Sequence, residues 1–275
     1  LKLRESAQFE LIKPKVEAAL KAYISRLLPS FLVLPVPSRG GERRISRQEI
    51  YYEHRKAGGA GCRRGSGRMK IVLASNNRGK LSELQALLDG LAVELIPQGV
   101  LGIPEAEEPF HTFLENALAK ARHASAHSGL PAIADDAGLC VDAFGGKPGV
   151  QTAYYATGFG YEKNDANNVR ALLEQMRDVD NRRAALVSTL VAVRSPDDPE
   201  PLVATGRATG EIARLPAGEG GFGFDPVLYL PELGKTFAEL SADEKNRRSH
   251  RGQAARTLAA LLRSQWLTEA ATQTA

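Results

Sequence analysis

Hydrophobic and polar positions follow two different periods along most of the chain. From residue 69 onward, short apolar runs are followed by stretches in which apolar residues recur every three or four positions, as on one face of a helix. The predicted strands are 70–74, 92–97, 131–134, 184–194 and 201–214, and the predicted helices are 78–89, 112–127, 164–177 and 249–265. Strands and helices in this mixed order predict an α/β protein.

The first 68 residues do not follow this pattern. Residues 9–28 fit one amphipathic helix, and residues 58–68 form a run rich in glycine and arginine with no hydrophobic period. Residues 1–68 hold 15 Lys+Arg and 6 Asp+Glu, a net charge of +9, whereas residues 69–275 have a net charge of −5. The basic character therefore belongs to the first quarter of the chain.

Residues 1–68 have three interpretations. They precede a natural start at Met69, they form a dispensable and mostly disordered extension, or they form a basic arm that contacts nucleic acid. The last interpretation lacks the interleaved aromatic and basic residues of a nucleic-acid surface. The acidic charge of residues 69–275 argues against a broad nucleic-acid surface there. We expect one folded domain, residues 69–275.

Composition excludes several classes of protein. No apolar run approaches the roughly 18–20 residues that a membrane-spanning helix needs. Cys62 and Cys140 are the only cysteines in the sequence, so no disulfide framework or cysteine-rich zinc site is expected. These features predict a protein of a reducing cytoplasm.

The first candidate site is Ser75-Asn76-Asn77-Arg78-Gly79-Lys80, between a predicted strand and a predicted helix. Backbone N–H groups at a helix N-terminus bind anions, and the helix dipole adds to this attraction. Arg78 and Lys80 lie in the first turn, where the dipole disfavours positive charge, so their placement favours phosphates in front of them. The glycine spacing differs from that of a Walker A loop. The alternative is a solvated helix start capped by asparagine.

The second candidate is the pair Asp135 and Asp136, which follows the predicted strand 131–134. Two adjacent carboxylates are costly to bury without a cation. Mg²⁺ prefers carboxylate oxygens, and one carboxylate can accept a proton from an activated water. The alternative is a turn in which aspartate caps a helix or is solvated.

The third candidate is Phe222-Gly223-Phe224-Asp225, within a glycine-rich run. Glycine lets the backbone approach a ligand closely, and an aromatic ring offers a flat face to a purine. Asp225 offers acceptors to base N–H groups. The alternative is a glycine-rich turn with a phenylalanine folded into the core.

The fourth candidate is Lys245 with Ser249-His250-Arg251, before the last predicted helix. Ser249 is a suitable N-cap, and the side chains of His250 and Arg251 donate hydrogen bonds to carbonyl or phosphate oxygens. The alternative is a polar helix start in solvent.

Helix 112–127 carries a polar stripe of Asn116, Lys120, His123 and His127. We expect this stripe to be the solvated face of the helix. Lys120 lies at the edge of that face, from which its long side chain would reach a phosphate.

These windows, in this order, resemble the inosine triphosphate pyrophosphatase family, whose members are also called XTP/dITP diphosphatases. The resemblance runs from Lys70 to about Leu262 and rests on five windows: Leu73–Lys80, Thr112–Ala117, Ala134–Leu139, Gly221–Pro226 and Ser249–Gly252. Each window alone is weak, but five in the same order are specific.

The resemblance implies a two-lobed inosine triphosphatase-like α/β fold, with a long mixed sheet flanked by helices, a cleft between lobes and a homodimer. It implies hydrolysis of noncanonical purine nucleoside triphosphates (ITP, dITP, XTP) to the monophosphate and pyrophosphate, with Mg²⁺. Asp136 would be the general base and a metal ligand, with Glu108 and Asp135 as further metal ligands. Glu107 is the alternative to Glu108 if the register differs by one residue.

The resemblance also implies the residues that bind substrate. The phosphates would be held by Ser75, Asn76, Asn77, Arg78, Gly79, Lys80 and Lys120; the base and ribose would be held by Phe222, Gly223, Phe224, Asp225, Lys245, His250 and Arg251. Ala137 replaces the serine usual in the family, so a hydroxyl contact is lost while a backbone N–H contact remains.

Two further functions stay open at this point. One is a related pyrophosphatase of the septum-inhibitor type that acts on modified nucleotides, against which the window at His250 and Arg251 argues. The other is a nucleotide-binding sensor without hydrolysis, against which the carboxylates at Glu108, Asp135 and Asp136 argue.

Overall fold

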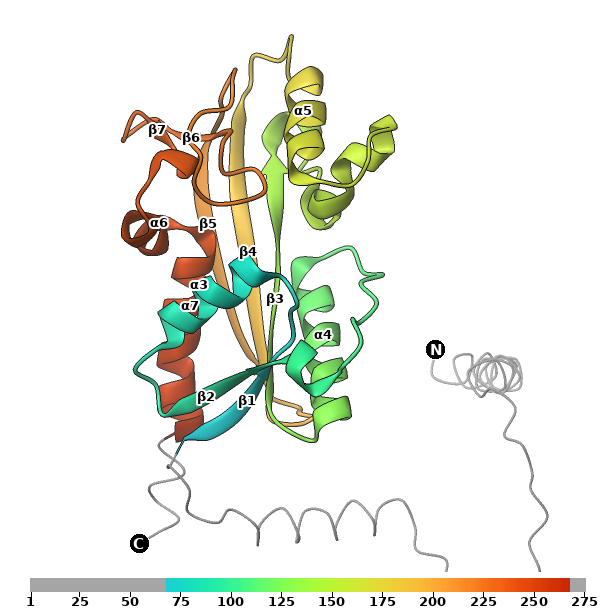
Figure 1. Ribbon diagram of the computed structural model, residues 1–275, viewed down its shortest axis with the longest axis vertical. Coiled ribbons are helices and arrows are strands. Elements are labelled where there is room, and N and C mark those ends of the chain that lie inside the picture. Colours follow the sequence, from blue (N-terminus) through green and yellow to red (C-terminus); the bar gives the residue numbers. More distant parts are fainter. Residues whose placement is uncertain (1–67, 268–275) are drawn as a thin grey trace, which may run out of the picture. The chain divides into compact units, whose positions relative to one another are not determined.

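Seven strands hydrogen-bond into one mixed sheet in the order β2-β1-β3-β4-β5-β6-β7 (Figure 1). The strands are β1 (Met69–Leu73), β2 (Val93–Pro97), β3 (Ala132–Val141), β4 (Arg183–Val193), β5 (Leu202–Ile212), β6 (Leu228–Leu230) and β7 (Lys235–Thr236). Strand β1 is parallel to both of its neighbours, β2 and β3, and all the other pairs are antiparallel. The structure is a computed structural model and describes residues 68–267, with the side chain of Arg78 left out.

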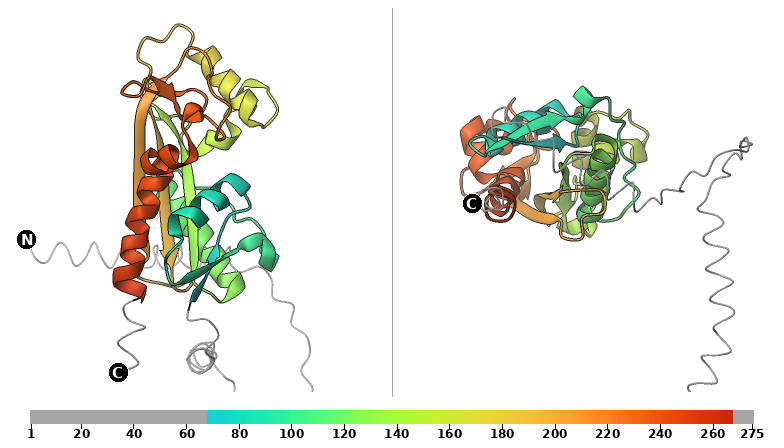
Figure 2. Two further views of the ribbon diagram at one scale, coloured as in Figure 1. Left: turned by 60° about the vertical axis from the view of Figure 1, so that its left-hand side comes forward. Right: turned by 90° about the horizontal axis from the view of Figure 1, so that it is seen from below.

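The helices lie on both faces of this sheet (Figures 1 and 2). They are α3 (Arg78–Leu88), α4 (Phe113–Ser128), α5 (Asp165–Gln175), α6 (Ala242–Arg248) and α7 (His250–Leu261). Shorter 3₁₀ segments are η1 (Gln98–Leu101), η2 (Asp142–Phe144), η3 (Gly149–Phe159) and η4 (Phe237–Glu239), and a π-helical turn η5 (Leu262–Leu267) follows α7. None of the helices in the described part of the chain is long and apolar enough to cross a bilayer.

The side chains of β1 show how the core is divided. Successive residues of a strand point to opposite faces of a sheet. Ile71 and Leu73 pack with the apolar faces of α3 and α7, whereas Val72 packs with small residues of α4, among them Ala117 and Ala121. The sheet is therefore buried on both faces here, which explains why the strand reads as one continuous apolar run.

A third core cluster lies at the other end of the long strands, where Leu139 of β3 packs with Leu172 of α5 and Phe237 of η4. We call this end the α5 lobe, which contains η3, α5, β6 and β7, and the other end the β1 lobe, which contains β1, β2, α3 and α4. Strands β3, β4 and β5 run through both lobes (Figure 1). All described residues fall in one compact unit.

Several helix starts confirm the predicted caps. The side-chain oxygen of Asn77 accepts a hydrogen bond from Lys80 N at 3.0 Å, and the hydroxyls of Thr112 and Ser249 accept from Glu115 N and Gly252 N at 3.2 and 3.0 Å. Each bond satisfies a backbone donor that the helix itself leaves free.

One predicted strand was wrong in length. We expected strand 131–134 to end before Asp135, but β3 continues through both aspartates to Val141. All ten residues of β3 pair with β4, so the partner strand overrides the low strand propensity of aspartate and glycine. The predictions made for residues 1–67, including helix 9–28, lie outside the described residues.

Candidate active site

The site forms where β1 stops and β3 continues. Strand β1 pairs with β3 only at Val72–Ala132 and Leu73–Ile133. Beyond that point no strand of residues 68–267 pairs with this edge of β3, and the chain turns away from β1 through Ser75 into helix α3. Ligands of open α/β sheets bind outside the carboxyl ends of strands at such points.

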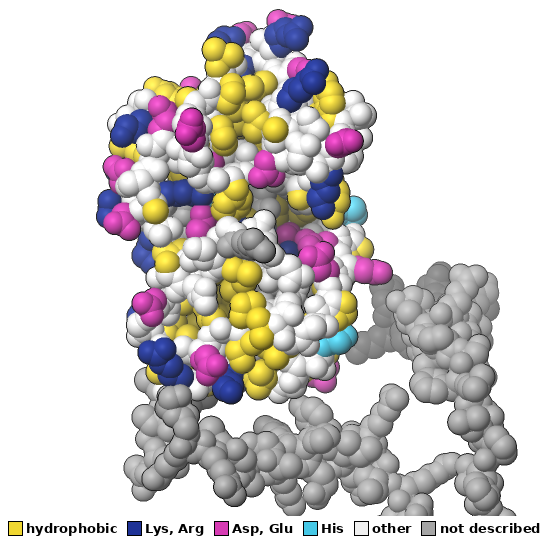
Figure 3. Space-filling view, viewed as in Figure 1, with side chains coloured by type: hydrophobic (Ala, Val, Ile, Leu, Met, Phe, Trp, Pro, Cys, Tyr) yellow, Lys and Arg dark blue, Asp and Glu magenta, His cyan; other side chains and the backbone are white. Residues whose placement is uncertain are grey.

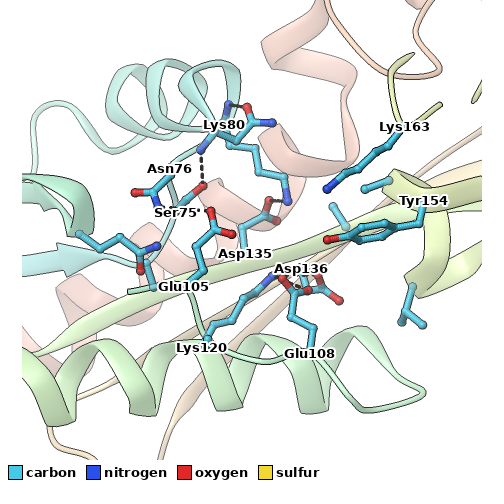
Figure 4. Close-up of a pocket in the computed structure, with 17 residues that line it drawn as sticks. Ser75, Asn76, Lys80, Glu105, Glu108, Lys120, Asp135, Asp136, Tyr154 and Lys163 are labelled. Atoms are coloured by element: carbon cyan, nitrogen blue, oxygen red, sulfur yellow. Dashed lines mark hydrogen bonds and ion pairs between the residues drawn. The ribbon is translucent and has the colours of Figure 1, made fainter. Parts of the chain in front are cut away.

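Two cavities open at this place. The first, which we call the carboxylate cavity, has a volume of about 240 Å³ (Figure 4). The residues that line it include Ser75, Asn76, Asn77, Lys80, Gln98, Glu105, Glu108, Lys120, Asp135, Asp136, Ala137, Tyr154 and Lys163. The space-filling view is hollowed at mid-height on this side, and acidic side chains gather there (Figure 3).

The second, the Phe222 cavity, has a volume of about 130 Å³. The predicted residues that line it are Asn77, Lys80, Ala137, Phe222, Gly223, Phe224, Asp225, Lys245, His250 and Arg251. Asn77, Lys80, Ala137 and Ala153 line both cavities, so the two are adjacent. The structure therefore brings together the four sequence windows, although they lie far apart in the chain.

Asp135 faces α3 and α7. Its Oδ2 accepts bonds from Arg251 at 3.0 Å and from Lys80 at 3.1 Å, and its Oδ1 accepts the hydroxyl of Ser188 at 2.6 Å. Burial alone would raise the pKa of Asp135, but Arg251 and Lys80 outweigh it and hold the pKa well below its usual range. Asp135 is thus a buried anion, ionised at neutral pH.

Asp136 faces α4. Its Oδ1 lies 2.9 Å from Lys120 Nζ, and the amide of Asn116 donates to its Oδ2 at 3.4 Å. Burial raises the pKa of Asp136; Lys120 opposes this rise and Glu108 adds to it. A raised pKa brings a carboxylate closer to the proton affinity that suits a general base.

Lys120 joins Asp136 to Glu108, because its Nζ is also 3.1 Å from Glu108 Oε2. The two carboxylates therefore converge on one cation. Burial lowers the pKa of Lys120, but Asp136 and Glu108 outweigh it and leave the pKa raised. No group of three or more acidic, histidine or cysteine side chains is arranged for a metal within residues 68–267. A pair of carboxylates still fits Mg²⁺, which keeps waters and takes substrate phosphates as its remaining ligands.

The polar stripe of α4 was predicted to be a solvated face, but part of it is buried. Asn116 is buried: its Oδ1 accepts from Phe110 N at 3.0 Å, and its amide donates to Phe110 O at 3.3 Å. The Lys120 side chain is only 12% exposed. His127 is exposed, as expected, and His123 is half-buried, with its Nε2 2.9 Å from Pro104 O. A helix period shows which residues share a face, but only the neighbouring strand shows that this part of the polar face is covered.

Glu83 connects the two basic residues of the fourth window. Its Oε2 pairs with Arg251 Nη1, and its Oε1 lies 2.8 Å from Lys245 Nζ. Lys245 Nζ also lies 2.8 Å from Asp225 Oδ2. Burial lowers the pKa of Lys245, but Asp225 and Glu83 outweigh it and leave the pKa raised. The predicted alternative of a solvated helix start is wrong, because Lys245, His250 and Arg251 are all buried.

Phe222 lines the second cavity and lies close to the Ser75–Lys80 loop. Lys245 Nζ is 4.6 Å from the centroid of its ring. A Cβ at Gly79 would lie 2.9 Å from that ring, so glycine there lets the ring approach the Ser75–Lys80 loop. Phe224 is only 2% exposed and packs in the core of the α5 lobe. Of the two alternatives for this window, Phe224 fits the one in which a phenylalanine is folded into the core, and Phe222 fits the one in which a ring faces a cavity.

His250 has a buried nitrogen, Nδ1, without a hydrogen-bond partner among the described residues. Burial, and then the neighbouring charge of Arg251, lower its pKa well below 6.5. The ring is therefore neutral at pH 7, and it lines the Phe222 cavity. A buried polar atom without a partner is costly in a folded protein, so this side chain is suited to a polar ligand.

The comparisons with known proteins identify the family of this chain. The model of the Ham1 family matches residues 71–261. The chain belongs to the Ham1 family. A protein of Albidiferax ferrireducens named dITP/XTP pyrophosphatase is 76% identical over 199 residues, 72% of this chain and 100% of the relative. A dITP/XTP pyrophosphatase of Acidovorax sp. is 73% identical over 198 residues, 72% of this chain and 97% of the relative.

Solved structures show the same fold. A HAM1 protein from Coxiella burnetii is 43% identical, with a TM-score of 0.67 over 71% of this chain and 99% of that one. A nucleoside-triphosphatase / dITP/XTP pyrophosphatase from Mycobacterium abscessus is 44% identical, with a TM-score of 0.55 over 70% of this chain and 99% of that one. The fold class and the family predicted from the sequence are confirmed.

Sequence reasoning missed several residues around the two cavities. Gln98, Glu105, Tyr154 and Lys163 line the carboxylate cavity, and Glu83 pairs with Lys245 and Arg251 of the Phe222 cavity. Glu83 lies one helical turn beyond Lys80, so a search for polar residues on that face would have found it. The others come from loops and 3₁₀ segments that carry no motif. The role predicted for the Arg78 side chain lies outside what the structure describes.

Proposed function

We propose that this protein hydrolyses noncanonical purine nucleoside triphosphates (ITP, dITP and XTP) to the nucleoside monophosphate and pyrophosphate. One observation carries the proposal: the carboxylate cavity adjoins the Phe222 cavity, and Lys80 lines both. One cavity is lined by carboxylates suited to Mg²⁺ and by lysines suited to phosphates, and the other is lined by an aromatic ring and polar groups suited to a base. A nucleoside triphosphate has these two parts side by side.

Asp136 is the proposed general base. It accepts a proton from a water, which attacks the α-phosphorus in line with the bond to the bridging oxygen of the pyrophosphate. That bond breaks, and pyrophosphate leaves with the electron pair. Lys80 and Lys120 offset the negative charge that grows on the leaving group.

Enzymes of this family are generally metal-dependent, and we infer that the metal here is Mg²⁺. Glu108 and Asp136, which converge on Lys120, are the residues that would hold it. When bound, Mg²⁺ supplies positive charge to the phosphate oxygens and lowers the pKa of a bound water. We propose that Asp135, although predicted as a third ligand, instead fixes Lys80 and Arg251, because both of its oxygens already accept bonds from the protein.

His250, Phe222 and Lys245 are the proposed base-binding residues. A neutral His250 donates from one ring nitrogen, and a 6-keto purine offers an acceptor. Adenine offers a donor at that position, and such a buried mismatch costs roughly 1–3 kcal/mol. Phe222 offers its ring face, which Lys245 and Arg251 flank at 4.6 and 5.6 Å from the ring centroid.

The test is pyrophosphate release by the full chain from equal concentrations of ITP, XTP, GTP, ATP and dUTP, with Mg²⁺ and with EDTA. We expect rapid, Mg²⁺-dependent release from ITP and XTP. Preference for dUTP or another pyrimidine would instead support the septum-inhibitor type of pyrophosphatase. Binding of ITP without release of pyrophosphate would support a sensor and contradict the proposal.

We further propose that the catalytic domain spans residues 69–275, that it forms a homodimer and that it acts in the cytoplasm without a nucleic-acid partner. The resemblance and the acidic charge of residues 69–275 support these points. Light scattering coupled to size-exclusion chromatography tests the dimer, and activity of a chain that begins at Met69 tests the domain boundary.

A further inference from the structure

Lys163 faces the carboxylate cavity from the α5 lobe. It lies in the turn between η3 and α5, across the cavity from Lys80 and Asp135 (Figure 4). Its Nζ is 3.8 Å from the centroid of the Tyr154 ring, and Tyr154 lines the same cavity. Neither residue belongs to a motif that the sequence singled out.

Lys163 differs from the other two lysines of the cavity because its partner is an aromatic ring and not a carboxylate. Lys80 pairs with Asp135 at 3.1 Å, and Lys120 pairs with Glu108 and Asp136. No carboxylate among residues 68–267 lies within ion-pair distance of Lys163 Nζ. An aromatic face holds an ammonium group weakly and leaves its charge in place. A phosphate therefore reaches Lys163 without displacing a carboxylate, whereas at Lys80 and Lys120 it competes with one.

The charges around the cavity favour such a cation. Glu105, Glu108, Asp135 and Asp136 line it together with only three lysines: Lys80, Lys120 and Lys163. Among the described side chains, the lining thus holds one more acid than lysine before any substrate or metal enters. A triphosphate carries several more negative charges, so an unpaired lysine at the wall contributes more to binding than a paired one.

The position of Lys163 indicates which phosphate it meets. Lys80 lines both cavities, but Lys163 lines only the carboxylate cavity. A nucleotide with its purine in the Phe222 cavity places its α-phosphate near the shared boundary and its β- and γ-phosphates farther into the carboxylate cavity. Lys163 lines the carboxylate cavity, into which those phosphates extend, and it comes from the lobe opposite the Ser75–Lys80 loop.

We propose that Lys163, held in place by the ring of Tyr154, binds the pyrophosphate portion of the substrate and makes the site selective for triphosphates over monophosphates. This inference rests on the proposed function. Lys163 is the binding residue, and Tyr154 is a positioning residue that acts through it.

The experiment measures inhibition by inorganic pyrophosphate and by IMP, and KM for ITP, in the full chain with Mg²⁺. For Lys163→Met we expect the inhibition constant of pyrophosphate and the KM to rise about tenfold, as for loss of one charge-assisted hydrogen bond. Inhibition by IMP should not change. Lys163→Arg, which keeps the positive charge, should bind pyrophosphate more tightly than Lys163→Met. Lys235→Met is the matched control, because Lys235 is an exposed lysine on β7 that lines neither cavity.

Two variants of Tyr154 test the positioning role. Tyr154→Ala should raise the inhibition constant of pyrophosphate, as Lys163→Met does. Tyr154→Phe should leave that constant near the wild-type value, because the ring face remains. An unchanged pyrophosphate constant in Lys163→Met would overturn the inference, and so would equal weakening of pyrophosphate and IMP. Calorimetric titration of pyrophosphate into the Mg²⁺-loaded protein measures the role of Lys163 in binding without turnover. It therefore tests this inference even if the wild type releases no pyrophosphate from ITP, which would contradict only the proposed function.

Discussion

Asp135 and Asp136 are adjacent in the chain, but their carboxylates lie on opposite faces of strand β3. Asp135 pairs with Arg251 and Lys80 on the side of α3 and α7, whereas Asp136 pairs with Lys120 on the side of α4. The pKa of Asp135 is lowered and the pKa of Asp136 is raised. One strand thus presents one carboxylate suited to fixing cations and one suited to accepting a proton.

Replacing Asp136 by asparagine should remove the proposed base with little loss of stability. We expect kcat to fall by about 10²–10⁴-fold, the range typical of general base catalysis. The raised pKa of the wild-type carboxylate also predicts that kcat falls as the pH drops, because the protonated acid cannot accept a proton. Steady-state kinetics over a pH series, with thermal unfolding of both proteins, measures these effects. An Asp136→Asn protein with wild-type kcat would exclude this residue as the base.

Replacing Asp135 by asparagine should mainly destabilise the fold. Arg251 and Lys80 would lose their shared counter-charge, and removal of one partner of a buried ion pair costs about 3–5 kcal/mol. Because the folded pKa of Asp135 is depressed, its stabilisation is complete above the ordinary value of 3.8 and is lost as the pH falls toward the folded pKa.

Urea unfolding of the wild type and Asp135→Asn at neutral pH, and again in acid, measures this difference. The gap in unfolding free energy should be large at neutral pH and should shrink only in strong acid. A gap below about 1 kcal/mol at neutral pH, the usual value for an exposed pair, would contradict the buried network.

Recognition of the base should not titrate with His250. Burial and the neighbouring Arg251 lower the pKa of His250 well below 6.5, so the ring stays neutral on both sides of that pH. We expect KM for ITP to show no inflection near pH 6.5. Stability should behave differently: the unfolded chain takes up a proton near 6.5 that the folded chain does not, so unfolding free energy falls as the pH drops below that value. An inflection of KM near 6.5 would show that His250 is ionised in the site.

Gly138 should not tolerate a side chain. A Cβ there would lie 2.3 Å from Gly149 O and 2.4 Å from Thr152 Oγ1, so β3 and η3 would have to separate. We expect Gly138→Ala to lower the unfolding free energy by about 1–3 kcal/mol. Gly158→Ala is the matched control, because a Cβ at Gly158 has no neighbour within 4 Å and its φ is not in the left-handed region. Equal midpoints of thermal unfolding for the two variants would contradict this packing.

The regular elements were predictable because each has a strong period. The runs at β1, β4 and β5 and the helical spacing of α3, α4, α5 and α7 gave boundaries within a few residues of the structure. Short elements such as β6 and β7 were not predicted, since a strand of two or three residues shows no period. The length of β3 was also missed, because pairing with β4, rather than its own composition, carries it past Asp136.

The candidate site was predictable where residues lie in compact motifs and unpredictable where they meet only in space. Ser75, Asn76, Asn77 and Lys80 of the first window and His250 and Arg251 of the fourth line the cavities. Asn116 was placed in solvent because a helix period does not reveal which neighbour covers a polar face. Glu83 reaches Arg251, 168 positions away, and nothing local in the sequence marks that contact.

The position of Gly79 beside the Phe222 ring has a thermodynamic consequence for the proposed function. A Cβ at Gly79 would lie 2.9 Å from that ring, and Lys80 lines both cavities, so we expect a ligand in one cavity to affect binding in the other. Linkage requires this effect to be reciprocal. If bound pyrophosphate changes the affinity for a purine by some factor, then a bound purine changes the affinity for pyrophosphate by the same factor. The cooperativity of the two halves of one nucleotide is therefore a single number, measurable from either side.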